Sequence, residues 1–222
     1  MLKRSQNTSN VRSETKLKLL DAGATLMRAH GYNATTVDDI CAAAGVTKGG
    51  FFHYFKNKEE IAKAALTRFY EIKLKDYDDA PFRQLADPLD RVLGRLDYVK
   101  TSIGGTNHKT KGCLIGVFAQ EMAFTNPDLR AACQSFFSKI ASDVANDLTA
   151  AKAMHPVKHD FDPKRLAMFY VSIVQGSLLL AKVAEDSGII GENIEQFRSY
   201  LQVLFGLPQT ASTTNASLLA SN

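Results

Sequence analysis

Cysteine is scarce in this chain and tryptophan is absent: the 222 residues hold three cysteines, Cys41, Cys113 and Cys133. Three scattered thiols are too few for a disulfide framework or a paired zinc knuckle. The longest charge-free apolar run, residues 166–181, is shorter than the roughly 18–20 apolar residues of a membrane span. The polar start MLKRSQNTSNVRSETK has no apolar stretch typical of a secretory signal. These absences predict a cytoplasmic protein without a membrane partner.

Common catalytic motifs are missing as well, because no G-x-S-x-G, H-E-x-x-H, P-loop or G-x-G-x-x-G pattern occurs. His155 and His159 have the spacing of a helical metal pair, but Pro156 between them is incompatible with a continuous helix. A zinc site in a loop would need more ligands than the neighbouring Asp160 and Asp162 supply. The sequence therefore predicts a protein that is not an enzyme and that holds no metal or cofactor.

Positive charge is concentrated at one end of the chain. The formal net charge is +4, with 45% hydrophobic and 23% charged residues, as in an ordinary globular protein. Residues 1–75 contain 13 Lys and Arg against 7 Asp and Glu, whereas residues 76–222 contain 14 against 16. This distribution indicates that the N-terminal third contacts a polyanion such as nucleic acid, unless the surface charge is merely scattered unevenly.

Apolar residues recur at helical spacing along most of the chain, and no segment shows the sustained alternation of a β-strand. The sequence therefore predicts an all-α fold. Gly188 and Gly191 should interrupt the helical pattern late in the chain, and Gly206 with Pro208 should end the last helix. Three of the expected helices begin with a capping residue followed by proline, at Asp87-Pro88, Asn126-Pro127 and Asp162-Pro163.

The segment Met168–Ala181 would be apolar on nearly all sides as a helix, so both of its faces need cover. Gly176 and Ser177 in its middle would let another backbone approach closely. A helix covered on one side by its own domain and on the other by a second copy of the chain fits this pattern. The central helix of a monomer fits it equally well.

Residues 35–60, TTVDDICAAAGVTKGGFFHYFKNKEE, contain two short expected helices joined by a turn. Thr36 is placed to cap the first helix, Gly45 to end it and Thr47 to cap the second. This is the spacing of the helix-turn-helix motif, whose second helix enters the major groove of DNA with its N-terminal residues. Those residues are TKGG at 47–50, where two glycines weaken the helix by about 1 kcal/mol each and allow close backbone approach.

The stretch GVTKGGFFHYFKNKEEI resembles the signature of the TetR family of bacterial one-component repressors, and the similarity extends over most of the chain. The resemblance implies a three-helix DNA-binding domain, a helical domain for ligand binding and dimerisation, and repression that a small molecule relieves. Phe52 stands where family members often have tyrosine, so it can offer only apolar contact, as to a thymine methyl. Spacing and resemblance together place these residues at the DNA: Thr36, Thr47, Lys48, Gly49, Gly50, Phe52, His53, Tyr54 and Lys58.

The resemblance also implies how the chain is divided and what it binds. Its expected partners are a double-stranded DNA operator, a small-molecule effector of unknown class, and a second copy contacted through Leu166–Asp186 and Glu192–Leu207. We expect four parts: a flexible basic arm (1–12), a helix-turn-helix DNA-binding domain (13–60), a helical effector-binding and dimerisation domain (61–207) and a disordered tail (208–222).

Two segments of the C-terminal half, KGCLIGVFAQEMAFTNPDLRAAC and QGSLLLAKVAED, are similar to a subgroup of the family with a G-C-L-x-G segment. Some members of that subgroup sense electrophiles or oxidants through the cysteine at the position of Cys113. This residue follows Gly112 at an expected helix start, where backbone N–H groups lower the pKa of a thiol. The resemblance places Lys182 nearby as a cation. Cys113 is thus either a reactive trigger or a small packed residue, whereas Cys41 and Cys133 are expected in the core.

Large side chains in the C-terminal half are candidates for an effector pocket, although each is also typical of a core position. Their pattern does not specify the chemical class of the ligand. An architectural DNA-binding protein without an effector, or an adaptor that has lost DNA contact, are the alternative functions, and an activator is the alternative to a repressor. The candidate effector-binding residues are Tyr98, Cys113, Phe118, Met122, Phe137, Phe169, Tyr170 and Lys182.

Overall fold

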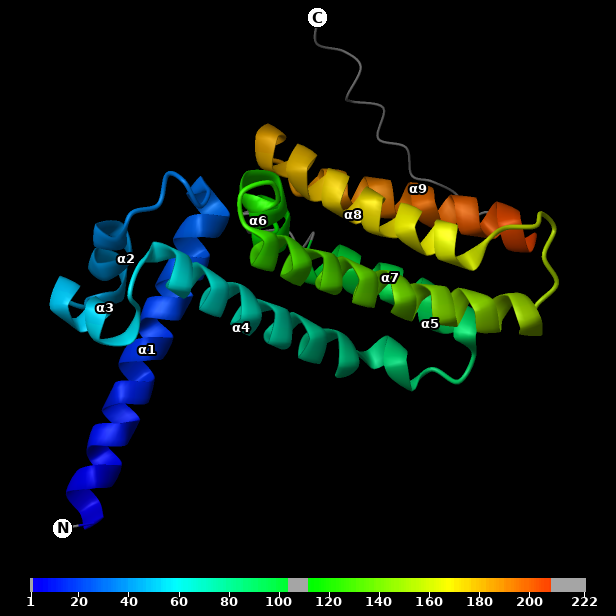
Figure 1. The fold of residues 1–222 in the computed structure, drawn as a ribbon. Coiled ribbons are helices and arrows are strands. Elements are labelled where there is room, and N and C mark those ends of the chain that lie inside the picture. The colour runs from blue at the N-terminus through cyan, green and yellow to red at the C-terminus, as the bar shows by residue number, and fades with distance from the viewer. Residues whose placement is uncertain (1, 104–111, 209–222) are drawn as a thin grey trace, which may run out of the picture.

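The computed structural model describes residues 2–103 and 112–208, with side-chain surroundings from residue 13 onward. Within these residues the chain forms nine α-helices, one short 3-10 helix and no strand, which confirms the predicted all-α fold (Figure 1). The helices are α1 (Leu2–His30), α2 (Val37–Ala44), α3 (Lys48–Tyr54), α4 (Lys58–Asp78), η1 (Pro81–Gln84), α5 (Pro88–Ser102), α6 (Leu114–Met122), α7 (Pro127–Met154), α8 (Pro163–Ala184) and α9 (Gly188–Phe205).

The capping residues before proline start three helices as the sequence predicts. The side chain of Asp87 accepts two backbone N–H groups in the first turn of α5, and Asp162 does the same for α8. Asn126 accepts the N–H of Leu129 at the start of α7. Each such cap satisfies an N–H group that has no partner inside the helix, which stabilises the helix by about 1 kcal/mol.

The helices α1, α2 and α3 pack as a small unit at one end of the molecule (Figure 1). Residues 2–12, for which the sequence predicts a basic arm, form the first turns of α1, and they contain no glycine or proline that would interrupt a helix. The helix ends before Gly31, which has a φ of +95°. Fully buried side chains from α1, α2, α3 and the start of α4 form the core of the unit: Leu19, Met27, Ile40, Phe51 and Ile61.

The helices α5 to α9 form a bundle, and α4 connects it to the N-terminal unit (Figure 1). The long helices α7 and α8 pack on each other, α9 packs on α8, and α5 packs on both α7 and α9. The short helix α6 lies at the junction, where it packs on α7 and also contacts α1 and α4. Movement in the bundle can therefore reach the N-terminal unit through α4 and through α6.

The break between α8 and α9 differs from the sequence expectation. Glu185, rather than a glycine, adopts the left-handed conformation (φ +53°) that ends α8. The carboxylate of Asp186 accepts the N–H of Gly188 at 2.8 Å, so α9 begins there and runs through Gly191. The two glycines thus lie inside the helix that they were expected to precede. Gly206 ends α9 as predicted, with a φ of +67°.

The helix α8 is apolar on both faces, but the described part of the chain covers only one of them. Val171, Val174 and Leu178 are buried against the bundle. By length and composition α8 could also cross a membrane, a property that core helices of soluble proteins share. Its other face leaves large apolar side chains between 49% and 78% exposed: Met168, Phe169, Leu179, Leu180 and Val183.

Candidate DNA-contacting surface and ligand cavity

The turn between α2 and α3 is built by local hydrogen bonds. The Thr36 hydroxyl accepts the N–H of Asp39, and the Asp39 carboxylate accepts the N–H of Thr36, which completes a capping box. Gly45 ends α2 with a φ of +64°, a conformation that costs other residues about 1–2 kcal/mol. Thr47 then caps α3 by accepting the N–H of Gly50 at 3.1 Å. This geometry confirms the predicted helix-turn-helix unit.

The face of α3 that points away from the core carries Lys48, Gly49, Phe52 and His53, all of them exposed. Phe51, the neighbour of Phe52, is fully buried and holds α3 on the unit. Phe52 itself is 51% exposed, although its side chain is large and apolar. The outer face of α3 therefore combines a cation, hydrogen-bonding groups and an uncovered aromatic ring, which together suit a groove of DNA.

The two glycines of α3 have different surroundings. A Cβ at Gly49 would meet nothing within 4 Å, whereas a Cβ at Gly50 would lie 2.8 Å from Cγ1 of Val46. Gly50 is therefore needed for α3 to pack against the turn. Gly49 leaves the outer surface of α3 without a protruding side chain at that position. The sequence predicts close approach of a partner at both glycines, and of the two only Gly49 faces open space.

Two lysines at the helix-turn-helix unit have partners within the chain. Lys48 Nζ lies 2.9 Å from Oδ1 of Asp38, and this hydrogen bond and charge raise the pKa of Lys48. Both side chains are exposed, so a phosphate could displace the carboxylate at little cost. Lys58 Nζ donates to the carbonyl of Tyr32 at 3.0 Å and lies 4.3 Å from the centre of its ring. Lys58 thus joins the start of α4 to the turn before α2.

The residues expected at the DNA fall into two groups by exposure. Tyr54 is partly buried, with its ring edge-on to that of His53 at a centroid distance of 4.9 Å, and Gly50 and Lys58 are partly buried too. The other expected residues are exposed: Thr36, Thr47, Lys48, Gly49, Phe52 and His53.

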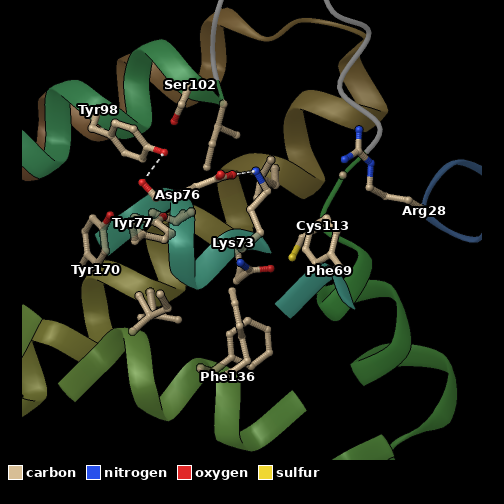
Figure 2. A pocket seen from close by; sticks show the side chains of 18 residues that line it. Arg28, Phe69, Lys73, Asp76, Tyr77, Tyr98, Ser102, Cys113, Phe136 and Tyr170 are labelled. Atoms are coloured by element: carbon tan, nitrogen blue, oxygen red, sulfur yellow. Dashed lines mark hydrogen bonds and ion pairs between the residues drawn. The ribbon is translucent and has the colours of Figure 1, made fainter. Parts of the chain in front are cut away.

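A cavity of about 240 Å³ lies between α4, α5, α7 and α8 and is also lined by Arg28 from the last turn of α1. Figure 2 shows Arg28 and Cys113 on one side of it and three tyrosines on the other. Concave, largely apolar sites with a few polar groups are the usual form of small-molecule sites. Much of the lining is aromatic: Phe69, Tyr77, Tyr98, Phe136, Phe137 and Tyr170.

Few charged groups line the cavity. Lys73 and Asp76 of α4 form an ion pair at 2.7 Å, and the Tyr98 hydroxyl donates to the backbone carbonyl of Asp76 at 3.2 Å (Figure 2). Burial raises the pKa of Tyr77 to about 12 and raises that of Tyr170 well above its usual value. Both of these hydroxyls therefore stay protonated at physiological pH.

The structure separates the residues that the sequence proposed for effector binding. Phe118 and Met122 of α6 are buried in the core, and Phe169 is half exposed on the outer side of α8. Lys182 lines a smaller, adjoining hollow of about 160 Å³, which it shares with Cys113. Four of the candidates line the larger cavity: Tyr98, Cys113, Phe137 and Tyr170.

Sequence reasoning missed Arg28, Phe69, Lys73 and Asp76, which also line the cavity. Arg28 lies on a helix that the sequence assigned to DNA binding, so nothing in its spacing connected it to a ligand. The other three lie on α4, where helical periodicity alone does not distinguish a cavity wall from a core face.

Cys113 is the N-cap residue of α6, as the sequence predicts. The N–H groups of Ile115 and Gly116 and the charge of Arg28 each lower the pKa of its thiol, but burial has the larger effect and raises it. Among the described residues the cation that lowers the pKa of the thiol is Arg28, whereas Lys182 lies in the adjoining hollow. A raised pKa keeps the Cys113 thiol protonated, which favours a packed residue over a reactive trigger.

Both halves of the chain match known families of regulators. Residues 19–65 match the bacterial regulatory proteins of the tetR family, and residues 95–195 match the C-terminal domain of LmrA/YxaF-like transcriptional regulators. The first match covers the helix-turn-helix unit and the second covers most of the bundle that encloses the cavity.

Similar proteins extend over most of the chain. The transcriptional regulator AcuR of Cereibacter sphaeroides is 31% identical over 74% of this chain and 75% of its own. The HTH-type transcriptional repressor DhaR of Mycobacterium sp. strain GP1 is 26% identical over 93% of this chain and 99% of its own. The crystal structure of a TetR transcriptional regulator from Chloroflexus aurantiacus superposes with a TM-score of 0.77 at 25% identity, over 87% of this chain and 96% of that one.

Proposed function

Because the chain belongs to the TetR family of bacterial regulatory proteins, we propose that it is a dimeric repressor that leaves a specific operator when a small molecule occupies the cavity. Regulators of this family bind DNA and are not enzymes. The observation that carries the proposal is the helix-turn-helix unit with its exposed face at residues 47–53. Repression is supported by the name of the relative DhaR, and we expect a cytoplasmic location.

The exposed face of α3 supplies the contacts to base edges. Lys48 would exchange Asp38 for a phosphate or a base edge, Gly49 would let the backbone approach, and Phe52 would meet a thymine methyl. Thr36 and Lys58 would contact phosphates on either side. Two such units in a dimer would contact half-sites about one turn of DNA apart, or multiples of it.

The second copy of the chain would cover the exposed apolar face of α8 and α9. Soluble monomers rarely leave a contiguous apolar patch of this kind uncovered. The contact would fall within the expected ranges Leu166–Asp186 and Glu192–Leu207 and would join α8 and α9 of one protomer to those of its partner. Its central side chains would be Met168, Phe169, Leu179, Leu180, Val183, Tyr200 and Val203.

Two elements connect the cavity to the helix-turn-helix unit. The helix α4 begins next to α3 and carries Phe69 and Lys73 to the cavity wall. The helix α6 begins after Cys113 at the cavity, and near its other end the Glu121 carboxylate accepts the N–H of Asn33 at 2.8 Å. A ligand that shifts either helix would favour dimers whose α3 helices no longer match the spacing of the half-sites.

The cavity also separates this proposal from its alternatives. An architectural DNA-binding protein needs no enclosed aromatic site, and an adaptor without DNA contact needs no exposed Lys48 and Gly49 on α3. Both features support a regulator that binds DNA at one end and a ligand at the other.

Binding of the purified protein to the intergenic DNA beside its own gene tests the repressor. We expect specific binding that Lys48→Ala weakens, because a cation is lost from the contact surface. The slope of affinity against salt falls if Lys48 contacts a phosphate, and preference at one base position relaxes if it contacts a base edge. Arg130→Ala is the matched control, since Arg130 is an exposed cation on α7. Binding governed by salt alone, without sequence preference, would instead support an architectural protein.

Light scattering at micromolar concentration tests the dimer. We expect a dimer for the natural chain and a monomer for Leu180→Glu, because the substitution places a charge in the apolar contact. Ile72→Glu is the matched control, since Ile72 is a similarly exposed apolar residue on α4. A monomeric natural chain would contradict this part of the proposal.

A further inference from the structure

Arg28 is a partly buried cation at the cavity, and none of the described carboxylates forms an ion pair with it. It lies in the last turn of α1 and lines the cavity on the side of Cys113 (Figure 2). Its Nε is buried and has no hydrogen-bond partner within the described residues. Burial lowers the pKa of Arg28, which shows that its surroundings disfavour the charge. Leaving a buried N–H of a charged group without an acceptor costs free energy, so an acceptor placed beside Nε would stabilise the protein.

Arg95 shows how the same fold accommodates an arginine that has only a structural role. It is 1% exposed, and its guanidinium lies 4.7 Å from the centre of the Phe82 ring. Its guanidinium nitrogens, like Nε of Arg28, have no hydrogen-bond partner within the described residues. Its Nη2 nevertheless lies 3.8 Å from Oδ2 of Asp147, so a carboxylate offsets the charge inside the protein. In the described part of the chain, Arg28 has neither a carboxylate nor an aromatic face of this kind.

The described lining of the cavity therefore carries one excess positive charge. Arg28, Lys73 and Asp76 are the charged residues among its described lining, and Lys73 is paired with Asp76 at 2.7 Å. The complement of this charge distribution is a ligand with one negative charge.

Apart from tyrosine hydroxyls, Ser102 and Gln175, the rest of the cavity is apolar, and it is small. Phe69, Phe136 and Phe137 line it together with Val171 and Val174. Its volume of about 240 Å³ lies below the roughly 300–1,000 Å³ of typical ligand pockets, so the ligand must be compact. Apolar walls also strengthen a charge pair, because they exclude the water that would screen it.

We propose that the cavity binds a small carboxylic acid with an apolar body, whose carboxylate pairs with Arg28. A guanidinium accepts a carboxylate well because its N–H groups match the two oxygens in a bidentate contact. A neutral carbonyl group could accept a hydrogen bond from Nε of Arg28 but would leave its charge uncompensated, and a cation would be repelled. The inference deepens the proposed function by naming the class of ligand. Release of DNA by the acid rests on the proposed function, whereas binding of the acid to the cavity does not require an operator.

The position of Arg28 also gives the ligand a direct contact with the DNA-binding half. Arg28 belongs to α1, which packs against both α2 and α4. An acid held between Arg28 and the phenylalanines of α4 and α7 thus touches the N-terminal unit and the bundle together. A change in that contact would alter the position of α1 relative to α7 and α8.

Calorimetric titration of the DNA-free protein with benzoate, phenylacetate and hexanoate, each beside its own amide, tests the inference. We expect at least one acid to bind about tenfold or more tightly than its amide. Arg28→Gln should weaken that acid by about tenfold to hundredfold and change the amide little, because a charge-assisted bond is lost. Arg28→Lys should keep part of the preference, and Arg130→Gln, on the exposed surface of α7, should keep all of it.

Three results would each overturn the inference. The first is equal affinity for an acid and its amide, and the second is a preference for the acid that survives in Arg28→Gln. The third is that none of the acids binds at millimolar concentration. Circular dichroism establishes whether Arg28→Gln is folded, and if it is not, Arg28→Lys and the acid–amide comparison on the natural chain decide. DNA binding measured in parallel separates the two proposals. Acid preference without specific DNA binding would refute the repressor alone, and specific DNA binding without acid preference would refute the acid site alone.

Discussion

The helix-turn-helix unit and the cavity differ in how their polar groups are satisfied. In the helix-turn-helix unit the capping residues bond groups three positions away, Thr36 with Asp39 and Thr47 with Gly50. At the cavity, Arg28 arrives through the packing of α1 beside the bundle, and its buried Nε has no partner among the described residues. The capping groups of the helix-turn-helix unit have their hydrogen-bond partners without DNA. The cavity lacks an acceptor for Arg28 among the described residues, and a ligand can supply it.

This difference implies different responses to binding. A complete, solvated surface exchanges water and counterions for phosphates, so its affinity for DNA depends strongly on salt. A cavity with an unpaired cation becomes more stable when its ligand binds, because a ligand that binds only the folded state raises the free energy of unfolding. Substitutions in one region should therefore change binding at that region more than at the other.

Phe51→Ala should break the helix-turn-helix unit and preserve the cavity. The Phe51 side chain is fully buried beneath α3, and such a truncation lowers the free energy of unfolding by about 3–5 kcal/mol. We expect specific DNA binding to be lost while the acid still binds in the cavity. Urea unfolding followed by circular dichroism measures the first effect, and calorimetric titration measures the second.

Phe52→Ala is the matched control for this experiment, because Phe52 is the neighbouring residue and is 51% exposed. It should change the free energy of unfolding by no more than about 0.5 kcal/mol and still weaken DNA binding. Loss of acid binding in Phe51→Ala would show that the two regions do not act as separate units.

Substitution of Gly49 and Gly50 by alanine should have effects of opposite sign on stability. Gly49→Ala adds a methyl group in open space and should raise the free energy of unfolding by about 0.5–1 kcal/mol, because alanine favours the helix. Gly50→Ala places the methyl group 2.8 Å from Val46 and should lower it by about 1 kcal/mol through overpacking. Urea unfolding compares the two variants. Equal stabilisation by both would mean that Val46 moves aside freely.

Much of the helix-turn-helix unit could be predicted from the sequence because its signals are local. Thr36, Gly45 and Thr47 act on groups within four positions, and the structure places each as expected. The same reasoning misplaced the break after α8. Gly188 and Gly191 were expected to interrupt the helical pattern, but Glu185 takes the left-handed conformation that ends α8. The hydrogen bond from Gly188 to Asp186 then lets α9 begin early.

The cavity could be predicted only in part, because it depends on which faces of distant helices meet. Tyr98 and Tyr170 were chosen as aromatic residues on helices, and they do line the cavity. Phe118 and Phe169 were chosen for the same reason, but one is in the core and the other on the outer face of α8. Arg28 shows the limit most clearly, because only the packing of α1 brings its charge to the cavity.

The smallest effect concerns the reactivity of Cys113. Burial raises the pKa of its thiol, so the group is protonated at pH 7 and should react with iodoacetamide more slowly than free cysteine. The labelling rate should rise with pH through a midpoint above that of an ordinary thiol, and mass spectrometry of the labelled peptide follows it, with Cys113→Ser as the control.

Slow labelling would mean that the cavity responds to a reversible ligand rather than to a covalent one. A rate equal to or above that of free cysteine at pH 7 would instead restore the trigger interpretation. An electrophile should then release DNA from the natural chain and not from Cys113→Ser. In that case the charge of Arg28 would serve to stabilise the Cys113 thiolate, and the acid preference expected for the cavity should be absent, because the cation already has its partner.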